Sequence, residues 1–108
     1  MLTAAQWLNW YKRERNCYSD YQLARRWQVD TSVISQYRRG RLRLPLAVIL
    51  EIAEATGAEP LEIITSLEFP RAPQAHRERI RRAYFDSLLK TAGDRMARQA
   101  CVADYHWP

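Results

Sequence analysis

The chain has little glycine, little cysteine and no long apolar run, and each shortage excludes a class of protein. Only three of its 108 residues are glycine and its β-branched residues are not clustered, which argues against an all-β fold. No stretch approaches the roughly 18 consecutive apolar residues of a transmembrane helix. The opening residues also lack the basic and apolar segments of a secretory signal, so we expect a cytoplasmic protein that does not bind membranes.

The few residues suited to metal binding or catalysis do not form a recognisable pattern. Cys17 and Cys101 lie far apart, and neither they nor His76 and His106 have the spacing of metal ligands. We therefore expect free thiols, no metal and no cofactor. The sequence shows no nucleophile–base motif, and the acids of residues 51–68 are spaced like a solvated helical face, so we expect no enzymatic activity.

Basic residues are abundant and unevenly distributed. The net charge is +5 and the isoelectric point about 9.6. Residues 1–43 hold nine Lys or Arg and three acids, residues 44–69 hold five Glu and no base, and residues 70–108 hold eight bases and four acids. Such blocks indicate a polarised surface that can meet phosphate groups on one side. A mixed charged surface that only maintains solubility explains the total but not the blocks.

Apolar spacing predicts an all-α protein, with five compact helices followed by a C-terminal helical extension. The first helix is expected over residues 3–15, with Thr3 and Gln6 forming a capping box at its start. Ser19 and Gln22 have the same spacing, which predicts a second capping box at the start of the second helix.

The fourth and fifth helices are expected between proline and glycine residues that mark their ends. The fourth is predicted from Pro45 to Gly57, and the fifth from Pro60 to about residue 66. Their expected buried positions are Leu46, Ile49, Leu50 and Ala53 in the fourth helix, and Leu61 with Ile63 or Ile64 in the fifth.

Two prolines in residues 69–73 divide the chain into a domain of residues 1–69 and an extension of residues 70–108. The extension is expected to form a long helix over residues 75–91 that ends at Gly93, followed by a further short helix. Its apolar edge is expected either to form a homodimer seam or to fold back onto the bundle. The residues of this edge are Ile80, Tyr84, Phe85, Leu88 and Leu89.

The stretch of residues 19–40 is the most informative part of the sequence. At about 100° per residue, Val33, Ile34 and Tyr37 fall on one face of the third helix. The opposite face carries hydrogen-bonding groups and one cation, namely Thr31, Ser32, Ser35, Gln36 and Arg39. Arginines follow at once in residues 38–43, which suits a helix that enters a nucleic-acid groove. An ordinary amphipathic surface helix is the alternative interpretation.

The residues of this stretch and of the following helix resemble those of the Cro/CI-type (Xre-like) helix-turn-helix family. The matching residues are Leu23, Ala24, Trp27, Val29, Ile34, Ser35, Gly40, Pro45, Ile52, Ala53 and Gly57. The resemblance covers about residues 3–67 and implies a five-helix lambda-repressor-like bundle whose third helix enters the major groove of double-stranded DNA.

Two positions depart from the family pattern. Asp20 stands where the family usually has glutamine, and we expect its carboxylate to repel phosphate. Gln28 stands at the turn position that is usually glycine. The turn is therefore either distorted, or Gln28 adopts a positive φ at a cost of about 1–2 kcal/mol.

The resemblance also implies roles for individual residues. Thr31, Ser32 and Gln36 correspond to base-reading positions, and an amide such as that of Gln36 can pair with adenine through two hydrogen bonds, worth about 1–3 kcal/mol of discrimination. The implied phosphate contacts are Ser19, Ser35, Arg39, Gly40, Arg41 and Arg43. Helix capping by the hydroxyl residues and solvated surface arginines are the alternatives.

The resemblance implies a sequence-specific DNA-binding transcriptional regulator, a repressor that acts as a homodimer. Small chains of this kind resemble regulators of phages and mobile elements, and the antitoxins of toxin–antitoxin pairs. The extension is too short for a conventional ligand pocket, so we expect no small-molecule effector. The alternative function is a protein-interaction module, an antitoxin or a phage-encoded inhibitor that binds a protein partner through exposed Trp10, Tyr105 and Trp107.

Overall fold

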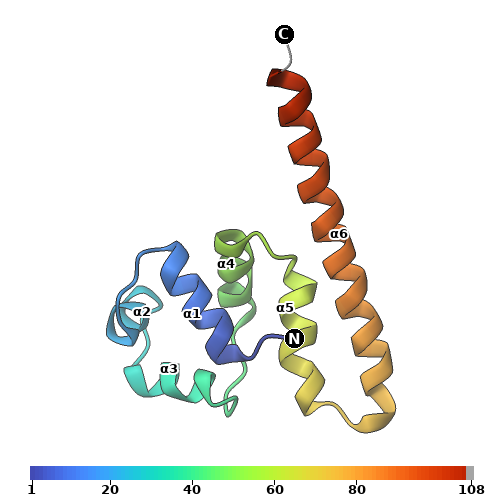
Figure 1. The fold of residues 1–108 in the computed structure, drawn as a ribbon. Coiled ribbons are helices and arrows are strands. Elements are labelled where there is room, and N and C mark those ends of the chain that lie inside the picture. Colours follow the sequence, from blue (N-terminus) through green and yellow to red (C-terminus); the bar gives the residue numbers. More distant parts are fainter. Residues whose placement is uncertain (107–108) are drawn as a thin grey trace.

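The computed structural model describes the backbone of residues 1–106 and the side chains of residues 1–93. In this part of the chain it contains six α-helices, one short 3-10 helix and no strand (Figure 1), which confirms the all-α prediction. The elements are α1 (Ala4–Glu14), α2 (Asp20–Arg26), α3 (Thr31–Arg38), α4 (Leu46–Thr56), α5 (Pro60–Glu68), η1 (Phe69–Arg71) and α6 (Gln74–His106).

The starts of α1 and α2 show how local side chains set helix ends. The capping box of α1 is confirmed, because the Thr3 hydroxyl accepts from the Gln6 amide and the Gln6 side chain accepts from the Thr3 amide at 2.8 Å. At α2, Ser19 caps the Gln22 amide as expected, but the Gln22 side chain accepts from the Tyr18 amide. The second capping box is therefore shifted by one residue.

The hydrophobic core lies between α1 and the helices that surround it. Trp7, Leu8 and Tyr11 of α1 are buried, as the predicted stripe requires, and they pack with Ile34 of α3 and Ile52 of α4. The Trp7 indole lies parallel to the Trp10 ring at a centroid distance of 5.6 Å. Its N–H donates to the Ser66 hydroxyl of α5 at 2.8 Å, which joins the first and fifth helices through the core.

The buried face of α4 differs from the predicted one. Leu46 and Leu50 are 61% and 48% exposed, whereas Val48 and Ile52 are buried beside Ile49 and Ala53. This helix has apolar side chains on nearly all sides, so the helical period alone does not select the buried face. Contacts with α1 and α5 make that selection.

The prediction for α5 is also wrong at one position. Leu61 is 49% exposed, while Ile63 is fully buried together with the polar residues Glu62 and Ser66.

The C-terminal extension forms one continuous helix after the 3-10 turn. α6 passes through Gly93 without interruption, so the predicted break and the separate short helix are wrong. Gly93 has no positive φ and its α-carbon faces open space, so it is an ordinary helical residue. The first part of α6 packs on α5 and η1, and the rest projects past the bundle (Figure 1). Among the described residues, no helix has the length and apolarity needed to cross a membrane.

The turn between α2 and α3 yields a stability prediction. Gln28 has a φ of 56°, so of the two alternatives predicted for this turn, a distorted turn or a positive φ at Gln28, the structure shows the positive φ. Replacing Gln28 by glycine removes a backbone strain of about 1–2 kcal/mol from the folded chain. Glycine also raises the conformational entropy of the unfolded chain, which opposes this gain with a somewhat smaller free energy. We therefore expect the free energy of unfolding to rise by about 0.5–1 kcal/mol. Urea denaturation followed by circular dichroism measures this change.

The matched control is the same substitution at Gln36, which is exposed in the middle of α3. There Gln36→Gly should lower the free energy of unfolding by about 1 kcal/mol, because glycine is a poor helix former. Equal signs for the two variants would contradict the strain at Gln28.

Candidate nucleic-acid interface

The orientation of α3 is set by its apolar face. Ile34 and Tyr37 are buried in the core, and Val33 is half-buried beside them. Ala24 of α2 is almost fully buried and small, which allows the two helices to approach closely. The Val29 amide donates a hydrogen bond to the Ala24 carbonyl at 2.9 Å, which stabilises the turn between α2 and α3.

The polar face of α3 consequently lies outside the core. The three side chains predicted to read bases, Thr31, Ser32 and Gln36, are all exposed on this face. Ser35 is half-buried. Asp30 occupies the N-cap position without a side-chain capping bond, and no hydrogen bond within the described part of the chain involves the Thr31 or Ser32 hydroxyl.

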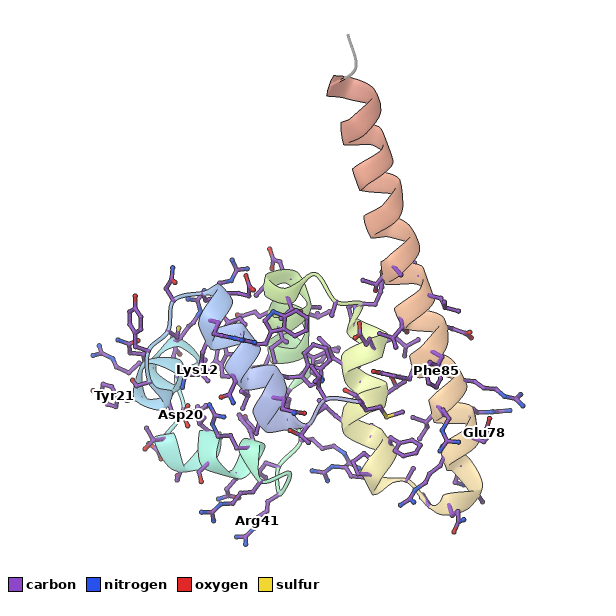
Figure 2. All side chains as sticks on the ribbon, viewed as in Figure 1. Lys12, Asp20, Tyr21, Arg41, Glu78 and Phe85 are labelled. Atoms are coloured by element: carbon purple, nitrogen blue, oxygen red, sulfur yellow. The ribbon has the colours of Figure 1, made fainter. Side chains whose placement is uncertain are left out.

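The loop after α3 presents cations next to that polar face. Gly40 ends the helix with a φ of 74°, and the Arg41 amide then donates to the Gln36 carbonyl at 3.0 Å. Arg39 and Arg41 are exposed and make no ion pair with any described residue, and Figure 2 shows Arg41 pointing away from the bundle. We refer to residues 39–43 as the basic loop.

Three of the predicted phosphate contacts already have partners within the chain. The Gly40 amide donates to the Tyr37 carbonyl at 3.1 Å, so this N–H is occupied by the helix end. The Arg43 side chain is exposed, but its Nε donates to a Glu68 carboxylate oxygen at 3.0 Å. Ser19 is half-buried at the start of α2, where its hydroxyl accepts the capping bond.

Asp20 is not an isolated negative charge on the surface. Arg38 donates to both of its carboxylate oxygens, at 2.7 and 2.8 Å, and Lys12 donates at 3.0 Å. These hydrogen bonds, those of Arg38 above all, hold the pKa of the Asp20 carboxyl below its ordinary value although partial burial raises it. Two cations therefore cover the carboxylate, and the repulsion of phosphate expected at this position is offset.

The Asp20 cluster also joins three helices. Lys12 belongs to α1, Asp20 to α2 and Arg38 to α3, and Arg38 further donates to the Asn9 side chain at 2.8 Å. Periodicity did not reveal this cluster, because its members are distant in sequence. The only signal was the presence of an acid at a position where the helix-turn-helix pattern has an amide.

The acids of α4 and α5 do not form a purely solvated face, which corrects the sequence interpretation. Glu51 accepts hydrogen bonds from the Tyr11 hydroxyl at 2.9 Å and the Trp27 indole at 2.8 Å. These hydrogen bonds, that of Trp27 above all, stabilise the charged carboxylate and so lower the pKa of Glu51. Glu62 is buried against the rest of the bundle.

The predicted dimer seam is divided by the packing of α6. Ile80, Tyr84 and Leu88 are half-buried on the side of α6 that packs against the bundle, where α6 contacts α5 and η1. Phe85 and Leu89 are 52% and 70% exposed and remain on the outside. Part of the apolar edge therefore folds back onto the bundle, and part stays uncovered.

The cysteines and histidines expected not to bind metal, and the aromatic residues proposed for protein binding, occupy other places. Within the described side chains no group of three or more His, Cys, Asp and Glu is arranged to hold a metal ion, and Cys17 is a free thiol. Trp10 is half-buried, stacks on Trp7 and donates to Glu14 at 3.2 Å. Cys101, Tyr105, His106 and Trp107 lie outside the residues whose side chains are described.

The Asp20 cluster predicts how stability depends on pH. Its carboxyl has a lower pKa in the folded chain than its ordinary value, so it stabilises the fold above about pH 4 and loses this effect as the pH falls through the folded value. Asp20→Asn should lower the free energy of unfolding at neutral pH. In this variant the free energy of unfolding should also fall less steeply as the pH is lowered. Urea denaturation at a series of pH values tests both effects.

Asp30→Asn is the matched control, because Asp30 is exposed and makes no side-chain capping bond. Its stability curve should follow that of the unmodified chain. A curve for Asp20→Asn that coincides with the Asp30→Asn curve would contradict the stabilising role of the cluster.

Comparisons with known proteins add no further assignment to this geometry. No protein-family model, no curated protein and no solved structure matches the chain.

Proposed function

We propose that the chain is a sequence-specific DNA-binding transcriptional regulator, a repressor that acts as a dimer by placing α3 in the major groove. One observation carries the proposal: the exposed face of α3 bears hydroxyl and amide groups, and the arginines without partners follow it directly. A lambda-repressor-like arrangement of α1–α5 and a cytoplasmic location are parts of the same proposal. So is the origin expected from the sequence, in a phage or mobile element.

The dimensions and chemistry of α3 suit groove binding. An α-helix with its side chains is about 10–12 Å across, which fits the major groove of B-form DNA, about 12 Å wide. The Gln36 amide both donates and accepts, so it can pair with the N6 and N7 atoms of an adenine. Thr31 and Ser32, at the start of the helix, can reach a base edge or a phosphate oxygen.

The basic loop supplies the contacts that do not depend on sequence. Arg39 and Arg41 are exposed cations with no ion pair among the described residues, so binding to phosphate breaks no existing pair. If each subunit neutralises about four phosphates, the logarithm of the affinity should fall with the logarithm of the salt concentration with a slope of about −3.6.

Two substitutions separate base reading from phosphate binding. Gln36→Ala should relax the preference at one base pair and weaken binding to the preferred duplex by about 1–3 kcal/mol. Arg41→Ala should weaken binding to all duplexes alike and make the salt slope less steep by about 0.9. Selection from randomised duplex DNA, followed by titration of the selected duplex at several salt concentrations, measures both effects.

An unchanged sequence preference in Gln36→Ala would contradict the assignment of base reading to α3. DNA binding without any preference, together with a protein that co-purifies, would favour the interaction module instead.

A dimer is proposed because paired half-sites lie about 34 Å apart and a single small module rarely achieves sufficient specificity. The uncovered part of the predicted seam, Phe85 and Leu89, is the proposed contact between copies. Leu89→Glu should convert the dimer to a monomer in light-scattering mass measurements without changing the helical content. Leu46→Glu, at a similarly exposed apolar position of α4, should leave the mass unchanged. A monomeric unmodified chain would exclude this seam.

A further inference from the structure

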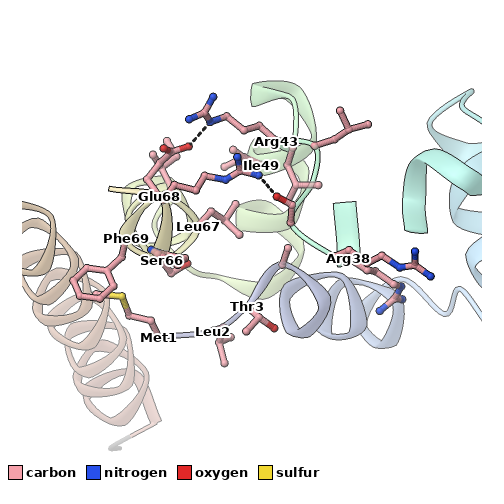
Figure 3. A pocket seen from close by; sticks show the side chains of 18 residues that line it. Met1, Leu2, Thr3, Arg38, Arg43, Ile49, Ser66, Leu67, Glu68 and Phe69 are labelled. Carbon is pink, nitrogen blue, oxygen red and sulfur yellow. Dashed lines mark hydrogen bonds and ion pairs between the residues drawn. The ribbon is translucent and has the colours of Figure 1, made fainter. Parts of the chain in front are cut away.

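A cavity of about 580 Å³ lies beside the basic loop, and Arg39, Gly40 and Arg43 of that loop are part of its lining (Figure 3). It is bounded by the first residues of the chain, by the basic loop with the end of α3, and by the end of α5 with η1. Its volume is within the range of about 300–1,000 Å³ that is usual for small-molecule sites.

The floor of the cavity is aliphatic. Leu44 and Ile49 are buried there, and Leu2, Ile64 and Leu67 pack against the same core while lining the cavity. The only aromatic side chain in the lining is Phe69, and the guanidinium groups of Arg77 and Arg81 already lie over its ring. Such a floor suits a flexible hydrocarbon chain better than a flat base or nucleoside, which requires a free aromatic face for stacking.

The rim of the cavity is cationic. Arg39, Arg43 and Arg71 line it together with a single acid, Glu68, which accepts a hydrogen bond from Arg43. Arg71 donates to the Gly40 carbonyl, and Arg39 makes no ion pair with any described residue. An aliphatic floor under an excess of guanidinium groups is complementary to a molecule with an apolar chain and one negative head group.

We propose that this cavity binds a medium-chain acyl carboxylate, with the chain on the aliphatic floor and the carboxylate on Arg71 and Arg39. This ligand class is contrary to the sequence-based expectation that no small molecule is bound. That expectation considered the C-terminal extension alone, whereas the cavity is formed by segments from both sides of the basic loop.

The position of the cavity predicts a regulatory effect, and this part of the inference rests on the proposed function. Two contacts hold the basic loop to its neighbours. Arg71 of η1 donates to the Gly40 carbonyl of the loop, and Arg43 of the loop donates to Glu68 of α5. A carboxylate that recruits Arg71 removes one of these ties and neutralises Arg39, a proposed phosphate contact. The ligand should therefore weaken DNA binding, and DNA should weaken ligand binding by the same factor.

Two tryptophan side chains make the binding step measurable without DNA. The Trp7 indole donates to the hydroxyl of Ser66, which lines the cavity, whereas the Trp27 indole donates to Glu51, which does not. The experiment is a titration of the nitrogen-15-labelled full chain with sodium decanoate below its micelle concentration. The Trp7 indole signal should shift with saturation, and the Trp27 signal should remain in place.

Controls separate the head group from the chain. Decan-1-ol, which has the same chain without the charge, should bind about tenfold more weakly or worse, because its neutral hydroxyl cannot form an ion pair with the guanidinium groups. Arg71→Ala should weaken decanoate binding by a similar factor. Arg82→Ala, which removes an exposed arginine of α6 outside the cavity, should leave binding unchanged.

The absence of a saturable Trp7 shift, equal binding of decanoate and decan-1-ol, or unchanged binding by Arg71→Ala would each overturn the site. In a second step, decanoate should weaken binding to the DNA duplex selected above. If decanoate binds and DNA affinity is unchanged, the regulatory effect is overturned while the site stands. Failure to select any duplex overturns the proposed function and leaves the indole titration intact.

Discussion

The burial of one face of α3 is the constraint on which the candidate interface depends. Ile34 is fully buried, and the burial of such a side chain contributes about 1.5–3 kcal/mol. Together with Tyr37 it determines which way the helix is turned. Because residues on the opposite side then cannot reach the core, the hydroxyl and amide groups of Thr31, Ser32 and Gln36 are left on the surface.

Polar contacts then set the position of α3 along its neighbours. The double hydrogen bond from Arg38 to Asp20 ties the end of α3 to the start of α2, and Lys12 adds a tie from α1. The same contacts compensate the negative charge of Asp20 at the edge of a basic surface. Glu51 of α4 has a comparable role, since Tyr11 and Trp27 donate to it. Both acids therefore contribute to architecture, although their positions in the sequence suggested exposed charges.

The basic loop connects the two proposals made for this chain. It presents Arg39 and Arg41 to solvent. It is held by hydrogen bonds from Arg71 to the Gly40 carbonyl and from Arg43 to Glu68. A loop held by a few polar contacts next to an aliphatic cavity can respond to a ligand more readily than a helix packed in the core. Phosphate binding and acyl-carboxylate binding would draw on the same arginines, which is why they should oppose each other.

The sequence by itself determined the helical class, the capping of α1 and the polar face of α3. Each follows from the spacing of residues within a few turns of one helix. Tertiary structure alone decided which side of α4 is buried, which cations cover Asp20, and how the first part of α6 packs on α5. These features, like the cavity, depend on which segments meet in space, and local spacing does not contain that information when a helix is apolar all round or when partners are distant in sequence.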